Sequence, residues 1–126
     1  MKMLLLNHFY LNGNKGVCVE ANPEAIADLE RVRSRDVIIC GGCGGIEDEG
    51  KSLNFYIMKD HPAINTFSKD AVAFWEEKGF KCEDIIKVPM FTLNTILNKH
   101  FDTASEFVFI DVEGYEYNIL KDLDFD

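Results

Sequence analysis

Carboxylates gather where the most apolar segment of the chain ends. Residues 107–111 read Phe-Val-Phe-Ile-Asp, which is typical of a buried strand, and Glu113 and Gly114 follow directly. An acid at the rigid end of a strand can orient a substrate hydroxyl or remove its proton if it lies in a partly desolvated cleft. Alternatively, Asp111 or Glu113 caps the following helix, since N-caps use the same residue types. The residues alone leave both interpretations open.

A second acid closes another short apolar run. Residues 16–20 read Gly-Val-Cys-Val-Glu, and a carboxylate just beyond a strand can accept hydrogen bonds from both hydroxyls of an adenosine ribose. Glu20 is therefore a candidate ribose ligand, and the alternative is that it only caps or solvates its own loop. Asn22 is an expected N-cap, because Pro23 follows at what would be the first helical position.

The segment Cys40-Gly-Gly-Cys43 has the spacing of a redox pair or of half a zinc site. The other cysteines and the histidines offer no paired spacing to complete a zinc site, so we predict no metal and favour ordinary thiols. The glycines around Cys43 also suggest a phosphate cradle. No complete phosphate-binding motif occurs, however, and the acids at 47–49 would repel phosphate, so a tight turn between two strands is favoured.

The composition is that of a single globular domain over residues 1–126. It is 47% apolar and 28% charged, and no segment approaches the roughly 20 apolar residues of a membrane span. The net charge of -9 opposes binding to nucleic acid or to an anionic membrane. The apolar stretch in MKMLLL is too short for an export signal, so we expect a cytoplasmic protein with reduced thiols.

Strands and helices are expected to alternate. The pattern predicts strands near 16–20, 36–40 and 52–58, a short edge strand within KVPMFT, and a strand over 106–111. Helices are predicted near 4–11, 23–34, 68–78 and 92–99, and within GYEYNILKDL. This order indicates a parallel-sheet α/β domain, in which ligands bind beyond the carboxyl ends of the strands.

Three segments together resemble one protein family. KGVCVEANPEAI, TLNTIL and FIDVEGYEYNILKDLDF are similar, in order and spacing over nearly the whole chain, to the FkbM family of S-adenosylmethionine-dependent methyltransferases. The resemblance implies a class I methyltransferase fold, a Rossmann-like three-layer sandwich with a mostly parallel sheet. It also implies S-adenosylmethionine as cofactor and methyl transfer to a hydroxyl of a sugar or another metabolite.

Carried over by position, the resemblance assigns Glu20 to the cofactor ribose, with Asn22 beside it. It places Asp111 and Glu113 at the methyl-transfer cleft. Because a sulfonium already makes the methyl group electrophilic, the protein needs mainly to align the acceptor oxygen and help to remove its proton, and no metal is required. The residues that would lie near the adenine edge are Gly42, Cys43 and Gly44.

One part of the family pattern is missing from the sequence. Family members carry a strand and an Asp-x-Gly-Ala-Asn-x-Gly-like loop before the strand that ends at Glu20, whereas here only MKMLLLNHFYLNGNK precedes it. Later strands of the family fold are expected beyond DLDFD. We therefore expect a truncated domain with weak or absent cofactor binding and turnover.

In the implied fold, the missing strand would lie between the strands that end at Glu20 and Asp111. Buried backbone groups without hydrogen-bond partners are costly, so either the flanking strands close up or another segment fills the gap. A partner chain or a second copy could supply that segment. The alternative to an enzyme is accordingly a non-catalytic α/β remnant or interaction module.

Overall fold

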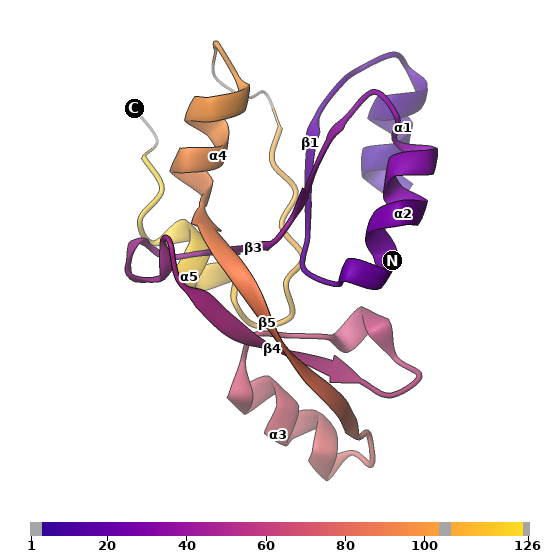
Figure 1. Cartoon of the computed structure of the whole chain (residues 1–126), viewed down its shortest axis with the longest axis vertical. Coiled ribbons are helices and arrows are strands. Elements are labelled where there is room, and N and C mark those ends of the chain that lie inside the picture. Colours follow the sequence, from indigo (N-terminus) through magenta and orange to yellow (C-terminus); the bar gives the residue numbers. More distant parts are fainter. Residues whose placement is uncertain (1–3, 104–106, 125–126) are drawn as a thin grey trace.

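The computed structural model describes residues 4–103 and 107–124 (Figure 1). Residues 1–3, at the start of the MKMLLL stretch, and Glu106, at the start of one predicted strand, lie outside the described residues. In chain order the elements are α1 (Leu4–Leu11), β1 (Val17–Glu20), α2 (Pro23–Val32), β2 (Val37–Cys40), β3 (Gly42–Gly44), the 3-10 helix η1 (Ile46–Asp48), β4 (Ser52–Met58), the 3-10 helix η2 (Pro62–Ile64), α3 (Lys69–Glu77), β5 (Cys82–Thr92), α4 (Leu93–His100) and α5 (Glu116–Leu120).

Local capping signals start and end the helices where the sequence predicted. Asn22 caps α2 by accepting a hydrogen bond from the backbone N–H of Glu24 at 3.1 Å. Ser68 and Thr92 cap α3 and α4 in the same way. Beyond α1, Gly13 adopts a left-handed φ of 89°, a conformation that glycine adopts without a steric penalty.

The strands form two small sheets. β1 pairs with β2 in parallel, from Val17 opposite Val37 to Glu20 opposite Cys40. In the other sheet β5 is central, with β3 parallel on one side and β4 antiparallel on the other. The prediction of an α/β domain is confirmed, and the described strands combine parallel with antiparallel pairing.

Gly41 is the single residue between the two sheets, because it separates β2 from β3. A Cβ at this position would lie 2.8 Å from the ring of Phe91 and 3.0 Å from the carbonyl oxygen of Pro89. Only a residue without a side chain fits such a close approach. The crossing between the sheets therefore requires glycine here.

Two predictions about the second sheet are wrong. The segment predicted as a short edge strand is part of the eleven-residue central strand β5, and the glycines predicted as a tight turn form β3. Proline cannot donate to a ladder, so it is rare in a central strand. In the structure Pro89 lies opposite Ser52 in the pairing with β4, and pairing with β3 begins only at the next residue, Met90.

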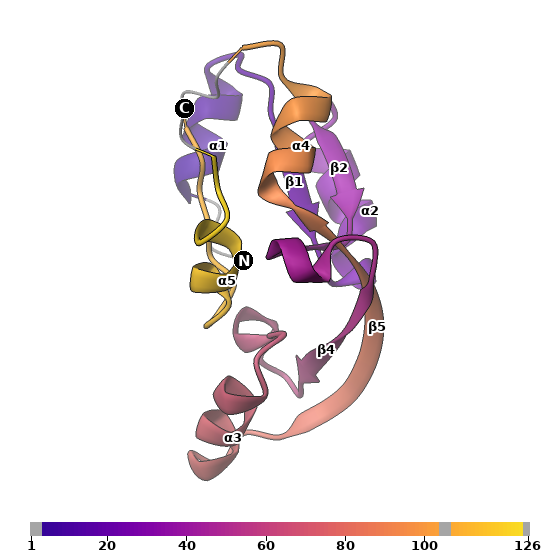
Figure 2. The same ribbon diagram turned by 90° about the vertical axis from the view of Figure 1, so that its left-hand side faces the viewer.

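The predicted strand at 106–111 is also wrong over its described part. No strand is assigned over residues 107–111, and Phe107, Val108 and Phe109 are each more than 40% exposed rather than buried. Figure 2 shows the segment beside α1, and the rings of Phe9 and Phe107 lie 5.1 Å apart. The apolar pattern is that of a strand, but a strand forms only where a neighbour offers hydrogen bonds.

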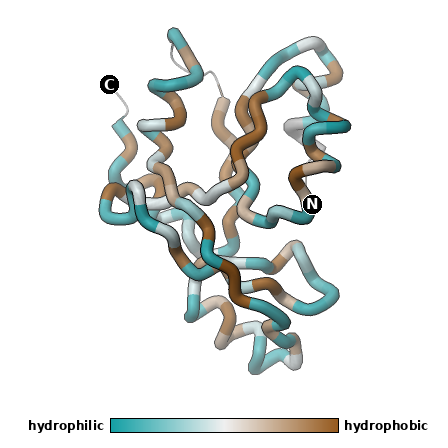
Figure 3. The backbone as a smooth tube through the Cα atoms, in the orientation of Figure 1, coloured by the Kyte–Doolittle hydropathy of each residue, from teal (hydrophilic) through white to brown (hydrophobic). Residues whose placement is uncertain are grey.

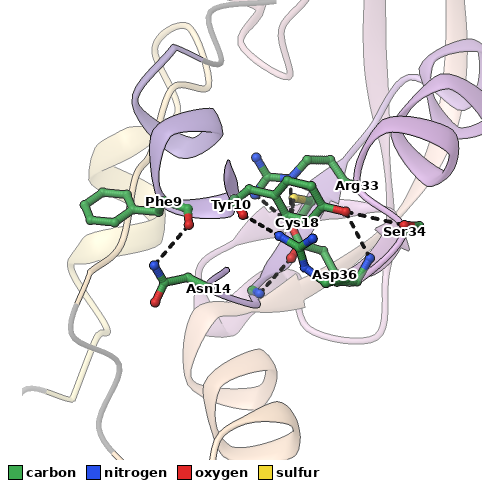
Figure 4. A network of polar contacts seen from close by, with 9 residues as sticks. Phe9, Tyr10, Asn14, Cys18, Arg33, Ser34 and Asp36 are labelled. Atoms are coloured by element: carbon green, nitrogen blue, oxygen red, sulfur yellow. Dashed lines mark hydrogen bonds and ion pairs between the residues drawn. The ribbon is translucent and has the colours of Figure 1, made fainter. Parts of the chain in front are cut away.

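A buried ion pair joins the elements of the amino-terminal half. The Nε and Nη2 atoms of Arg33 lie 2.7 and 2.6 Å from Oδ2 of Asp36, and the two side chains are 5% and 0% exposed (Figure 4). Asp36 also accepts hydrogen bonds from the backbone N–H of Gly16 at 2.8 Å and from the thiol of Cys18 at 3.6 Å. The guanidinium of Arg33 lies over the ring of Tyr10, which attaches α1 to the same cluster.

The apolar core of the second sheet lies between β4, β5 and α3. Figure 3 shows hydrophobic residues along the β1 and β2 pair and again along the β4 and β5 pair. Tyr56, Met58 and Val72 are buried together, and Trp75 and Phe80 pack against them. Among the described residues, no helix has the length and apolar character that a membrane span requires.

Truncating the core should show how far stability depends on it. Met58 is 2% exposed, so Met58→Ala should lower the free energy of unfolding by roughly 2 to 5 kcal/mol, because a cavity remains. Urea unfolding followed by circular dichroism measures the change. Ile85→Ala is the matched control: Ile85 is 53% exposed on β5, and its truncation should change stability by no more than about 0.5 kcal/mol. Equal losses in both variants would contradict this assignment of the core.

Candidate active site

The acids that follow residue 110 lie in a tight turn with an unusual backbone. Glu113 has a φ of 50° and Gly114 a φ of 95°, so two successive residues are left-handed. The carboxylate of Glu116 closes the turn by accepting hydrogen bonds from the backbone N–H groups of Val112 at 3.4 Å and of Gly114 at 3.0 Å.

This arrangement excludes one of the two interpretations of the acids. The residue that caps α5 is Tyr115, without a side-chain capping bond, so neither Asp111 nor Glu113 caps the helix. Within the described residues, no hydrogen bond or ion pair engages either of these two carboxylates. Asp111 is exposed and Glu113 is half-buried. Both acids therefore remain available to a ligand.

Tyr115 joins the turn to η1. Its hydroxyl donates a hydrogen bond of 2.8 Å to Oδ2 of Asp48, which is 7% exposed and also accepts from the backbone N–H of Gly45. Burial, followed by the neighbouring carboxylate of Asp48, raises the pKa of Tyr115 well above its ordinary value, so the phenol stays protonated and remains the donor. The sequence analysis missed this contact, since its partners stand 67 residues apart and follow no periodic pattern.

Glu20 lies half-buried at the carboxyl end of β1. Its Oε1 accepts a hydrogen bond of 2.7 Å from the backbone N–H of Asn22, so the carboxylate does cap its own loop. Its second oxygen has no hydrogen-bond partner among the described residues. The loop-capping alternative is thus observed, and it leaves one acceptor oxygen of a fixed carboxylate available.

The glycines of β3 are packed closely by the side chains of Phe67, Met90 and Asp48. A Cβ on Gly42 would lie 2.5 Å from the ring of Phe67, and one on Gly44 would lie 2.6 Å from Oδ2 of Asp48. Both glycines are buried, whereas Cys43 between them is half-buried. A ligand could reach Gly42 and Gly44 only through backbone groups on their remaining sides.

Phe67 brings the two parts of the predicted site together. Its ring covers Gly42, and its centroid lies 5.7 Å from that of the Tyr115 ring, next to the acidic turn. Glu20 lies next to the start of β3, because the backbone N–H of Gly41, the residue before Gly42, donates to the carbonyl oxygen of Glu20 at 3.0 Å. Two surface hollows of about 210 and 310 Å³ lie elsewhere and are lined by none of the predicted site residues.

The thiol environment bears on the hypothesis of a redox or metal site. Burial, and then the carboxylate of Glu49, raises the pKa of Cys43 to about 11, whereas reactive Cys-x-x-Cys thiols have a lowered pKa. In the part of the chain that the structure describes, no three His, Cys, Asp or Glu side chains are grouped to hold a metal ion. The observed environment of Cys43 is that of an ordinary buried thiol.

Alkylation should distinguish the two cysteines of this segment. At pH 8 a thiol of pKa about 11 is thiolate in about one molecule in a thousand, so Cys43 should react with iodoacetamide much more slowly than the exposed Cys40. Mass spectrometry of digested samples measures both rates, and Cys40→Ser should remove the fast reaction. Equal labelling rates at the two positions would contradict the buried environment of Cys43.

Comparison with known proteins gives one match. The family model described as the methyltransferase FkbM domain matches residues 4–126, which is nearly the whole chain. Neither a curated protein nor a solved structure matches the sequence. The family match includes both acid-bearing segments, around Glu20 and around Asp111, and it agrees with the resemblance of the three sequence segments. The chain belongs to the FkbM methyltransferase family.

Proposed function

We propose that this chain is an S-adenosylmethionine-dependent methyltransferase that acts on a hydroxyl oxygen of a sugar or another small metabolite. Family membership supports methyl transfer. The observation that carries the proposal is the acidic turn, which is fixed through backbone contacts while no described residue engages the carboxylates of Asp111 and Glu113. The class I layering of the family fold is part of the same proposal.

Glu20 has the chemistry that a ribose ligand requires. Its Oε1 is held by the N–H of Asn22, which orients the carboxylate, and its other oxygen can accept a hydrogen bond from a ribose hydroxyl. Asn22 itself is occupied in capping α2, so its contribution is to hold Glu20.

The adenine edge would be lined by residues 42–44. Cys43 would offer its half-buried side chain, whereas Gly42 and Gly44 would contribute backbone groups, because Phe67 and Asp48 cover them on the side where a Cβ would project. Such backbone groups can pair with a base edge without any charged side chain.

The two free acids would act on the acceptor. When bound, the sulfonium cofactor supplies an electrophilic methyl group. Asp111, which is exposed, can accept a hydrogen bond from the acceptor hydroxyl and take its proton as the oxygen becomes alkylated. Glu113 is half-buried beside it and can hold a neighbouring hydroxyl, which keeps the reacting oxygen in line.

Calorimetric titration with S-adenosylmethionine tests the cofactor assignment. Glu20→Gln should weaken binding about tenfold, because a ribose hydroxyl would lose a charged acceptor. Glu24→Gln is the matched control: Glu24 is exposed in the first turn of α2 and should leave the affinity unchanged. No binding by the unmodified chain at millimolar cofactor would contradict the proposed function.

Asp111→Asn should retain cofactor binding and reduce methyl transfer to a panel of sugars by about a hundredfold.

A second candidate function is an interaction module that accepts a strand from another chain. It is favoured by one observation: residues 108–111 pair with no strand among the described residues, and their exposed side chains include Val108 and Phe109. β1 likewise pairs with β2 alone among the described strands. Exposed, extended backbone is a template on which a further strand can add.

If a second copy supplies that strand, light scattering should show a dimer whose fraction rises with concentration. Phe109→Ser should reduce the dimer fraction, since it removes apolar surface from the segment. Tyr117→Ser is the matched control, because Tyr117 is 77% exposed on α5. A monomer at all concentrations, or equal effects of both changes, would exclude self-association through this segment.

A further inference from the structure

We propose that Thr66 is a positioning residue that sets the direction of the catalytic acids. The inference rests on the proposed function, in which Asp111 and Glu113 act on the acceptor. The hydroxyl of Thr66 donates a hydrogen bond of 2.8 Å to the backbone carbonyl oxygen of Glu113, although the two residues are 47 positions apart. Thr66 is 0% exposed, so water does not compete for this hydroxyl.

Thr66 is itself held by three hydrogen bonds to its neighbours. Its backbone exchanges hydrogen bonds with Tyr56 of β4 in both directions, at 2.9 and 3.2 Å. Its hydroxyl oxygen accepts a bond of 3.0 Å from the backbone N–H of Ser68, at the start of α3. A hydroxyl carries one proton, and with this acceptor bond in place that proton is directed to Glu113. Thr66 therefore transmits the rigidity of the second sheet to the acidic turn.

The turn depends on such external support. Glu113 holds a left-handed φ of 50°, which is uncommon for a residue with a side chain and persists where surrounding contacts impose it. Glu116 restrains the turn from one side through Val112 and Gly114, and Thr66 restrains it from the other. A Cβ placed on Gly114 would lie 3.8 Å from the Cβ of Ser68, so the turn lies close to the start of α3.

The consequence concerns the two carboxylates directly. Since neither carboxylate is engaged by a described residue, their directions follow from the backbone of residues 111–113. Releasing the carbonyl of Glu113 would let that backbone leave the left-handed region and would turn the side chain of Glu113 away. No hydrogen bond between described residues joins Thr66 to Glu20, the proposed ribose ligand, so cofactor affinity would be spared while alignment of the acceptor would be lost.

The test compares Thr66→Val, which keeps the shape and removes the hydroxyl, with Thr66→Ser, which keeps the hydroxyl. Thr103→Val makes the same chemical change at an exposed threonine. The readout is the backbone conformation of Glu113, measured by NMR from its three-bond H–N–Cα–H coupling and its ¹³C shifts. Thr66→Val should lose the left-handed signature, whereas Thr66→Ser and Thr103→Val should keep it.

Function is tested with S-adenosylmethionine as the probe. Thr66→Val should bind the cofactor within about twofold of the unmodified chain and lose about tenfold or more in methyl transfer, because misplaced groups lower rate rather than affinity. Thr66→Ser should restore the transfer rate. If the unmodified chain binds no cofactor, the proposed function fails, and the NMR comparison still decides whether Thr66 sets the turn.

If Thr66→Val does not fold, a measurement on the unmodified chain still tests the proposal. In the unmodified chain the hydroxyl proton of Thr66 should exchange slowly with water and show a nuclear Overhauser effect to the Gly114 amide. A rapidly exchanging hydroxyl, or a left-handed Glu113 retained in Thr66→Val, would overturn the proposal.

Discussion

The amino-terminal half of the molecule depends on the buried carboxylate of Asp36. Its side chain is 0% exposed and accepts hydrogen bonds from Gly16 before β1 and from Arg33 beyond α2. An ionised group is stable in such a place only when it is paired, and removing one partner of a buried pair costs about 3 to 5 kcal/mol. Asp36 therefore fixes the amino ends of β1 and β2 and the carboxyl end of α2. The parallel register that starts there places Glu20 opposite Cys40 at the carboxyl end.

Local chemistry made much of this fold predictable. Asn22 with Pro23 marks the start of α2 through contacts within three residues, and the structure confirms this prediction. Strand predictions were wrong where the structure depends on hydrogen bonds to a neighbouring strand. Residues 108–111 have the composition of a strand but pair with no described strand, and Pro89 lies in a central strand whose two neighbours no local pattern could reveal.

The candidate site, like the fold, was predictable from the sequence only in part. Acids after apolar runs made Glu20, Asp111 and Glu113 candidates, because residue type and position after an apolar run are visible in a sequence. The groups that hold the acids were not identified. Thr66 and Tyr115 act through hydrogen bonds over 47 and 67 positions, and a threonine or tyrosine in a loop carries no periodic signal. A map of contacts, rather than a pattern of residues, is needed to find them.

The ring of Phe67 has a consequence for how this family member can change over evolutionary time. It rests on Gly42 at one end of the site and adjoins Tyr115 at the other. A side chain larger than hydrogen at position 42 would displace the ring, and the displacement would reach the residue that follows the acidic turn. Substitutions on the proposed cofactor side and on the proposed acceptor side are thus mechanically linked, and natural variants should alter positions 42, 67 and 115 together rather than one at a time.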